Sequence, residues 1–107
     1  MISTHILDTS KGFPASGVKV FLDSNRNGVW TDLASGETNS DGRHVFDIPY
    51  LAGQYRIRFG IEDYYSRSGM KPFFLDVPIA FEITDTTRKY HIPLLLNPFG
   101  YSTYRGS

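Results

Sequence analysis

The chain has 107 residues, of which 15% are aromatic, and its 11 Lys and Arg residues balance 11 Asp and Glu residues. This length fits a single domain over residues 1–107, and the even charge disfavours nucleic acid and anionic membranes as partners. Because cysteine is absent, disulfides, thiol nucleophiles and Cys-ligated zinc are all excluded.

The sequence also lacks the signals of membrane insertion and export. No segment approaches the ~18 consecutive apolar residues of a membrane-spanning helix. The first residues, MISTH, do not show the basic, then apolar, then small-residue order of a signal peptide. We therefore expect a cytoplasmic protein that has no membrane partner.

The first half of the chain consists of short alternating segments separated by turn residues. Residues 2–8 and 18–22 alternate with the period of two that is typical of half-buried strands. The pair Asn27-Gly28 favours a hairpin turn, and residues 39–42, NSDG, favour a second tight turn. We expect strands at residues 2–8, 18–22, 30–33 and 43–46.

The second half contains the one segment that favours a helix. Residues 61–68 have two acidic side chains near their start and a glycine just after their end, as short helices often do. We expect strands at residues 54–60, 77–83, 89–96 and 100–105. The spacing of these segments predicts an all-β sandwich of about eight strands in two sheets with one short helix.

The C-terminal segment, residues 90–107, is too rich in apolar and aromatic side chains for a frayed chain end. An apolar run leads into a Pro-Phe-Gly turn, and alternating residues then continue to Arg105. We expect this segment to be docked on the rest of the fold. His91 near its start and Arg105 near its end are then available for function.

Three histidines and one arginine are the first candidates for a reactive site. His5 and His91 each lie on an expected strand, where a histidine is more often structural than functional. Arg43 follows a tight turn that would fix it at the start of a strand. His44 is the next residue and therefore points to the opposite face, so we interpret it as an ordinary surface or edge residue.

Two histidines with one or two arginines can form a hydrolytic site that needs neither metal nor another cofactor. One histidine with a pKa near ~6.5 can take a proton from water while a second orients or protonates the reacting group. Arginine can hold an anionic substrate and stabilise a developing oxyanion. Two histidines fall short of the three protein ligands usual at catalytic zinc. Both His5 and His91 are open as the base.

A structural calcium site is an alternative at residues 23–28, DSNRNG. This segment matches the first half of a calcium-binding loop, with oxygen ligands at alternate positions followed by glycine. The match fails at Ala34, where such a loop places its bidentate Glu. Asp32 and Glu37 could complete an irregular site, although the segment equally fits a plain Asn-Gly hairpin.

Several segments together resemble one enzyme family. They are ISTHILDT at residues 2–9, GFPASGV at 12–18, TNSDGR at 38–43 and YHIPLLLNPFGYSTYRGS at 90–107. In this order and spacing they are similar to the signatures of the 5-hydroxyisourate hydrolases, the transthyretin-related enzymes of purine breakdown. The terminal Tyr-Arg-Gly-Ser is the most specific of them, because transthyretin carriers lack it.

This resemblance implies a transthyretin-like sandwich that assembles as a homotetramer, a dimer of dimers with sites at the dimer–dimer interface. It implies hydrolysis of 5-hydroxyisourate at a cyclic amide bond to give 2-oxo-4-hydroxy-4-carboxy-5-ureidoimidazoline. The family's catalytic residues, which act without metal, fall on His5, Arg43 and His91. Its pocket-shaping residues fall on Tyr104, Arg105, Gly106 and Ser107.

Two other functions are alternatives to the hydrolase. The same fold could carry a small ligand without catalysis, as transthyretin does for thyroid hormone. Residues 18–28 are also similar to the calcium-binding B-type repeats of bacterial surface adhesins, which are small β-sandwiches. Those repeats have no reason to carry the C-terminal signature.

Overall fold

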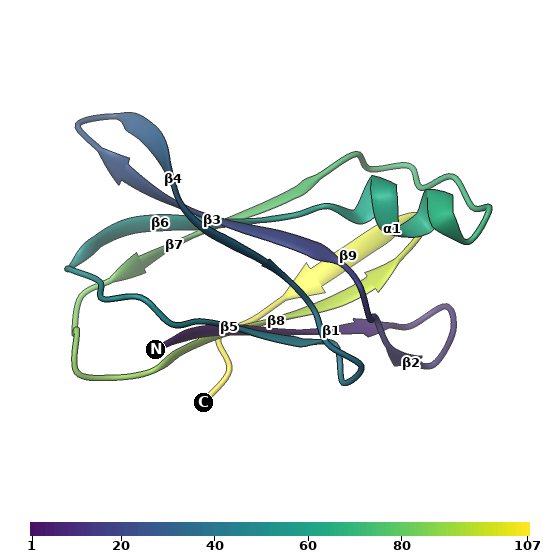
Figure 1. Ribbon diagram of the computed structural model, residues 1–107, viewed down its shortest axis with the longest axis horizontal. Coiled ribbons are helices and arrows are strands. Elements are labelled where there is room, and N and C mark those ends of the chain that lie inside the picture. Colours follow the sequence, from purple (N-terminus) through teal and green to yellow (C-terminus); the bar gives the residue numbers. More distant parts are fainter.

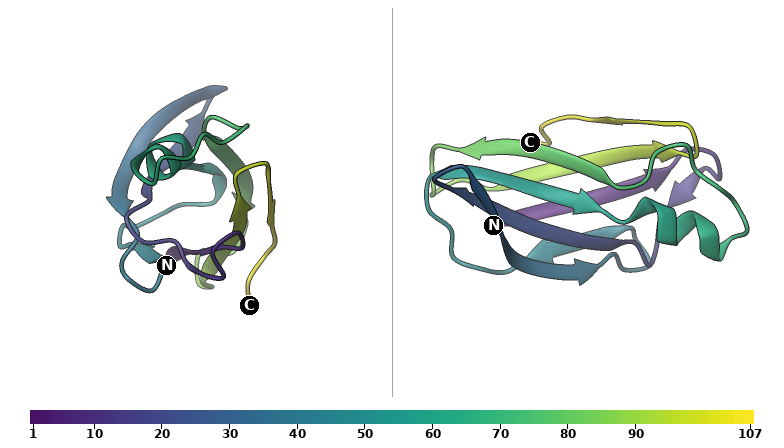
Figure 2. Two further views of the ribbon diagram at one scale, coloured as in Figure 1. Left: turned by 90° about the vertical axis from the view of Figure 1, so that its right-hand side faces the viewer. Right: turned by 90° about the horizontal axis from the view of Figure 1, so that it is seen from above.

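The computed structural model describes all residues 1–107, as two β-sheets that lie face to face with one helix at an end of the sandwich (Figure 1, Figure 2). The helix is α1 (Ile61–Arg67). This arrangement confirms the predicted all-β sandwich with one short helix. The strands are β1 (Ile2–Asp8), β2 (Phe13–Pro14), β3 (Lys19–Arg26), β4 (Val29–Glu37), β5 (Arg43–Phe46), β6 (Gly53–Phe59), β7 (Val77–Ile83), β8 (Tyr90–Asn97) and β9 (Gly100–Thr103).

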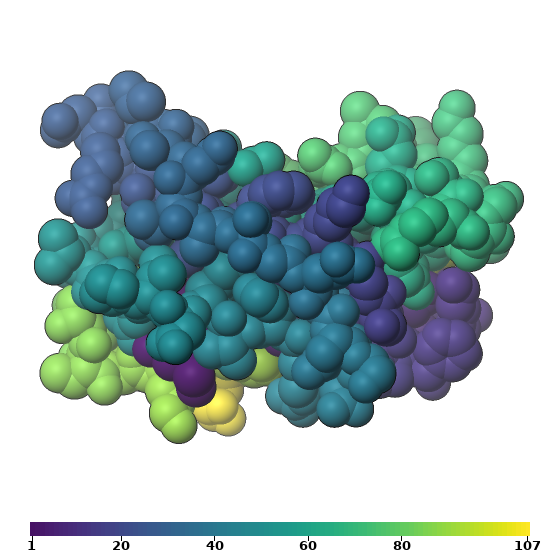
Figure 3. Space-filling view, viewed as in Figure 1, coloured from purple at the N-terminus to yellow at the C-terminus, as the bar shows by residue number.

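The first and last strands of the chain lie in the same sheet. One has the strand order β2-β1-β8-β9, with β5 also paired to β1, and the other has the order β4-β3-β6-β7. β1 and β8 run parallel, with Ile2 opposite Tyr90 and Asp8 opposite Leu96. The first and last parts of the chain are therefore neighbours, and Figure 3 shows yellow C-terminal atoms beside purple N-terminal ones.

The core lies between the sheets and follows the alternation of the sequence. In β1 every even-numbered residue is buried and every odd-numbered residue is partly exposed. In β6, Tyr55, Ile57 and Phe59 are buried and the residues between them face outward, as predicted. Burying one large apolar side chain contributes about 1.5–3 kcal/mol. The cluster of 19 buried hydrophobic residues therefore supplies most of the attraction between the sheets.

Three strands differ markedly in length from the prediction, and the two-residue strand β2 was not predicted. β3 runs to Arg26, well past the expected end at residue 22 and into the segment expected to be a loop. β4 extends well beyond residues 30–33, because it pairs with β3 along one long hairpin from Arg26 opposite Val29 to Lys19 opposite Glu37. β9 ends at Thr103, and beyond it only Gly106 pairs with β8, through an isolated bridge to His91. The C-terminal segment is docked as predicted, but its last residues do not continue the strand.

The helix occupies its predicted place, and its charged side chains are arranged favourably with respect to the helix dipole. α1 has Glu62 and Asp63 in its first turn and Arg67 in its last turn, which places each charge at the favourable end. It buries Ile61, Tyr64 and Tyr65 against the sandwich. With so few residues, it is too short to cross a membrane.

Candidate active site

The outer face of the five-stranded sheet brings together His5, Arg43 and His91. Because the even-numbered residues of β1 are buried, His5 and Ser3 both point outward. His5 is paired directly with Arg43 of β5, and Ser3 is paired directly with His91 of β8. Directly opposed residues share a face of the sheet. The three side chains predicted to be catalytic are therefore placed on one surface.

Ser3 contacts His91 and was not among the predicted residues. Its Oγ lies 2.8 Å from Nδ1 of His91, which is hydrogen-bond distance. The sequence does hold one indication of Ser3: it lies two residues before His5 and therefore on the same face of the strand. Serine is common in strands, however, and this contact joins residues that are 88 positions apart.

Gly106 lies against the opposite edge of the His91 ring. Its backbone N–H donates a hydrogen bond of 2.8 Å to the carbonyl oxygen of His91. A Cβ built on Gly106 would lie only 2.6 Å from Cδ2 of His91, closer than real Cβ atoms approach. Glycine is therefore required here for close approach, and the docked tail forms one wall around the histidine.

A cavity of about 320 Å³ opens beside this cluster. No Asp or Glu side chain lines it, whereas Arg43 and Lys89 both do. Ser3, His91 and Ser107 are also in its wall. The cavity is thus suited to a small anionic molecule, which arginine can hold through paired hydrogen bonds.

The surroundings of His91 favour its neutral form. Burial lowers the pKa of the imidazole below its ordinary value of 6.5, and electrostatic repulsion from Arg43, and then from the neighbouring His5, lowers it further. At pH 7 the ring is therefore uncharged and able to accept a proton. A neutral histidine beside an arginine combines a proton acceptor with a group that stabilises negative charge.

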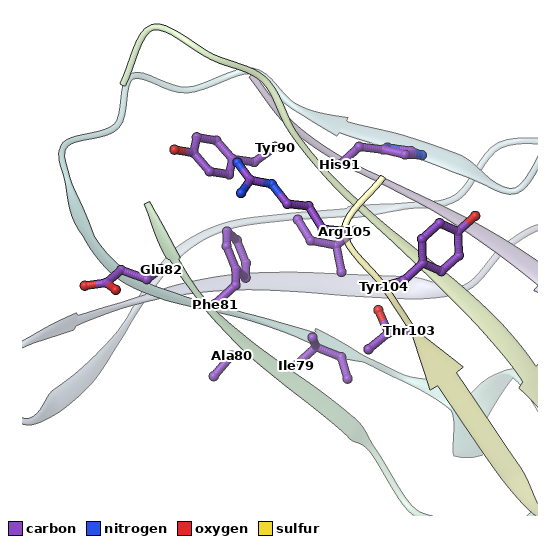
Figure 4. Close-up of a pocket in the computed structure, with 10 residues that line it drawn as sticks. Ile79, Ala80, Phe81, Glu82, Tyr90, His91, Thr103, Tyr104 and Arg105 are labelled. Atoms are coloured by element: carbon purple, nitrogen blue, oxygen red, sulfur yellow. The ribbon is translucent and has the colours of Figure 1, made fainter. Parts of the chain in front are cut away.

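Tyr104 and Arg105 line a second cavity, of about 280 Å³, on the β7 side of the C-terminal segment, and His91 is also in its wall. The guanidinium of Arg105 lies over the ring of Tyr90, 5.3 Å from its centroid. In Figure 4 it extends toward Tyr90, whereas the imidazole of His91 points the other way. Within one chain, Ser107 lines the cavity that holds Arg43, whereas Tyr104 and Arg105 share a cavity wall only with His91 of the proposed catalytic residues.

His44 lies on an edge strand, as predicted, since β5 pairs only with β1, but its ring is half-buried and turned toward the sandwich. Its ring packs edge-on against Phe46, with the centroids 4.7 Å apart. A Cβ on Gly36 of β4 would lie 2.0 Å from Cε1 of His44, so the two strands touch here. Burial lowers the pKa of His44. Alternation places His44 opposite Arg43 but does not reveal that β4 covers that face.

Asp23, the first residue of the calcium alternative, is engaged by two arginines. Its side chain is 1% exposed and accepts hydrogen bonds of 2.9 Å from Arg56 and 2.7 Å from Arg58. Burial raises the pKa of Asp23, but hydrogen bonds and charges from Arg58 and Arg56 outweigh it, so the pKa is lowered. No group of three or more His, Asp or Glu side chains is placed to hold a metal ion. Asn25 Oδ1 accepts a hydrogen bond of 3.0 Å from the backbone N–H of Gly28, as in a plain Asn-Gly hairpin.

Comparison with known proteins places the chain among hydrolases of similar length. The HIUase/Transthyretin family matches it over residues 2–106. The 5-hydroxyisourate hydrolase of Salmonella dublin is 43% identical over 110 residues, which cover 100% of this chain and 81% of the relative. The structure of Klebsiella pneumoniae 5-hydroxyisourate hydrolase is 40% identical with a TM-score of 0.86, over 99% of this chain and 98% of the other.

A transthyretin has the same fold with lower sequence identity. Sea bream transthyretin, in complex with thyroxine, has a TM-score of 0.91 and 31% identity, over 98% of this chain and 93% of the other. The fold is therefore common to both kinds of protein, whereas sequence identity is higher to those named hydrolases. These similarities bear out the family and the hydrolase function predicted from the sequence. The chain belongs to the HIUase/Transthyretin family.

Proposed function

We propose that this chain hydrolyses 5-hydroxyisourate to 2-oxo-4-hydroxy-4-carboxy-5-ureidoimidazoline in urate breakdown, as a single domain of residues 1–107. The observation that carries the proposal is the convergence of His5, Arg43 and His91 on one face of a sheet. It occurs in a chain that is similar over its whole length to proteins named 5-hydroxyisourate hydrolase. These three residues are the proposed catalytic groups.

The proposed reaction adds water across a cyclic amide without metal or cofactor. One of the two histidines takes a proton from water while the water oxygen bonds to the ring carbonyl carbon. The amide C–N bond then breaks, and the leaving nitrogen receives the proton from the imidazolium. The former carbonyl carbon becomes a carboxylic acid, and the histidine returns to its neutral form. The acid then releases the second proton of the water to solvent and becomes a carboxylate.

Positive charge in the cavity supports the choice of substrate. Arg43 is positioned to stabilise the negative charge that develops on the carbonyl oxygen during attack. Lys89 lies in the wall of the same cavity, and no acidic side chain opposes the two. This distribution of positive charge suits a urate-like anion. The nearby cations stabilise both the bound substrate and the oxyanion that forms during attack.

The C-terminal residues are the proposed binding segment. Gly106 contacts His91, and Ser107 lines the cavity. Tyr104 and Arg105 line the cavity on the other side of the tail, whose wall they share with His91. Deleting residues 104–107 should therefore lower activity far more than the melting temperature. Equal activity of the shortened chain would contradict this role.

We further propose that the chain assembles as a homotetramer with active sites at the dimer–dimer interface. Phe73, Phe74 and Tyr101 form a chain of edge-to-face contacts on the surface, and Phe99 nearby is 74% exposed. Exposed apolar clusters of this kind mark interaction surfaces. In addition, β7 and β9 are sheet edges with one side unpaired, where strands of a second copy can add.

The assembly is tested by light scattering after size-exclusion chromatography. A tetramer should have four times the chain mass of 12.1 kDa. Phe99→Asp should give smaller species with less activity, because a charge would be buried at an interface. Val29→Asp is a matched control, since Val29 is 62% exposed on the other sheet. A dimeric variant with full activity would contradict the proposed location of the site.

A non-catalytic carrier is the second candidate, favoured by the similarity to the transthyretin–thyroxine complex. The two functions are separated by following the ultraviolet spectrum of freshly generated 5-hydroxyisourate with and without the protein, alongside a thyroxine titration. Accelerated decay supports the hydrolase. Thyroxine binding with no change in the decay rate would favour the carrier.

A further inference from the structure

The imidazole of His91 is held along two opposite edges. On one edge, Nδ1 lies 2.8 Å from Oγ of Ser3. On the other, Cδ2 faces Gly106 so closely that a Cβ there would lie 2.6 Å away. The ring can neither flip by 180° nor tilt toward the tail without breaking the hydrogen bond or meeting backbone atoms.

This arrangement distinguishes the two ring nitrogens. Nδ1 is bonded to Ser3, whereas Nε2 makes no hydrogen bond within the chain. In a neutral imidazole one nitrogen carries the proton and the other accepts one. A hydroxyl that accepts from Nδ1–H leaves the lone pair of Nε2 available, and the partner of one nitrogen commonly fixes the state of the other.

We propose that Ser3 is a positioning residue, whose hydroxyl accepts a hydrogen bond from Nδ1–H of His91 and thereby keeps Nε2 as the proton-accepting nitrogen at the cavity. Ser3 does not touch the reacting atoms in this account; it acts through His91. The catalytic consequence rests on the proposed function, because it makes His91 the group that takes the proton from water. The tautomer itself does not depend on any substrate.

The charges around the ring are consistent with this role. Arg43 and His5 share the outer face with His91, and Lys89 lines the same cavity. No Asp or Glu side chain lines the cavity that His91 shares with Ser3, and Glu82 is the one acidic residue in the wall of the other cavity that His91 lines. A neutral hydroxyl is thus the partner, and it orients the ring without adding charge. It differs in this from the carboxylate that orients histidine in a Ser-His-Asp triad.

The first test is nitrogen-15 NMR of the histidine rings in the full chain at a pH where His91 is neutral. We expect the Nδ1–H tautomer of His91 to predominate in the wild type. In Ser3→Ala the Nε2–H form should become substantially populated, and Ser3→Thr should restore the original pattern because it retains the hydroxyl. A wild type in the Nε2–H form, or an unchanged spectrum in Ser3→Ala, would overturn the proposal.

The second test is steady-state hydrolysis of 5-hydroxyisourate by the same variants. Ser3→Ala should lower kcat by about 10- to 100-fold with little change in KM, because a misdirected ring slows proton transfer more than binding. Ser3→Thr should recover most of the rate. Ser35→Ala, which removes an exposed hydroxyl from β4, serves as the control and should match the wild type.

The two tests separate failure of this inference from failure of the proposed function. If the tautomer responds to Ser3→Ala as expected but the wild type does not hydrolyse the substrate, the positioning role stands and the substrate assignment falls. If the wild type is active and Ser3→Ala retains its full kcat, the positioning role is refuted while the hydrolase remains. Thermal melting of each variant verifies that the compared proteins are folded.

Discussion

The backbone N–H of Gly106 donates a hydrogen bond to the carbonyl oxygen of His91, with N and O 2.8 Å apart, and its Cα faces the imidazole of the same residue. The end of the chain is thereby fixed to the strand that carries a proposed catalytic group. His91 is held by residues from both ends of the sequence, since Ser3 lies on its other side. The position of the ring therefore depends on the docking of the tail.

Gly106→Ala should lower hydrolysis by about 10- to 100-fold, because a displacement of a catalytic group by about 1 Å has that effect. The added Cβ would meet Cδ2 of His91 at 2.6 Å, so the ring or the tail must move. Gly100→Ala is the matched control, because the nearest side-chain atom to its Cβ would be 3.9 Å away. Equal rates for the two variants would show that the close contact does not position the ring.

The pKa of His91 should depend on Arg43. Because burial and the charge of Arg43 both lower this pKa, Arg43→Gln should raise it toward 6.5 while leaving it below that value. The measurement is an NMR titration of the His91 ring, with Arg26→Gln as a control on the other sheet. An unshifted pKa in Arg43→Gln would show that the guanidinium does not act on the ring.

The same lowered pKa sets the acid limb of the rate profile. A base must be neutral to act, so the pH at which kcat/KM is half-maximal should lie below 6.5, at the depressed pKa of His91. A half-maximal rate above pH 6.5 would contradict His91 as the base.

His44 should make the fold less stable in mild acid. The pKa of His44 is lower in the folded chain than its value of 6.5 in the unfolded chain. At a pH between the two pKa values, the unfolded chain therefore binds more protons than the folded chain. The free energy of unfolding should therefore be steady above pH 6.5 and decrease as the pH falls below it. Urea unfolding at several pH values measures this, and His44→Gln should show a shallower decrease. If His44→Gln shows the same pH dependence as the wild type, titratable groups other than His44 cause the loss of stability.

Asp23→Asn should lower the free energy of unfolding by about 1–3 kcal/mol, because a buried charged hydrogen-bond acceptor for two arginines is lost. Asp32→Asn is the control. Its carboxylate pairs with Arg58 at 3.3 Å but is 93% exposed, so the expected change is within about 0.5 kcal/mol. Equal effects of the two substitutions would show that burial does not strengthen the Asp23 pairs.

The strands could largely be predicted from the sequence, because alternation reports directly which side of a strand is buried. It correctly separates His5 from Ile6 and Arg43 from His44. It cannot report what covers the buried side. That is why the edge position of His44 was predicted but its contact with Gly36 of β4 was not. The length of β4 was missed for a related reason, since its exposed residues are ordered by pairing with β3 and not by burial.

The candidate site was predictable in part. His5, Arg43 and His91 were candidates by residue type, the resemblance gave them a catalytic role, and the sheet pairing puts them on one face. Ser3 was missed because the parallel pairing of β1 with β8 joins segments that no local pattern connects. The direction of the Arg105 side chain was likewise not predictable. The strand expected over residues 100–105 would have determined which face Arg105 is on, but β9 ends at Thr103.

The most direct test of the central claim is the decay of freshly generated 5-hydroxyisourate, followed by ultraviolet absorbance with wild-type protein, His5→Ala and His91→Ala. We predict that the wild type accelerates the decay strongly. We predict that each variant loses roughly 10²–10⁴-fold in kcat/KM, the scale for removing a general acid or base, while keeping its fold by circular dichroism. A wild type that leaves the decay unchanged, or two variants as active as the wild type, would contradict the account.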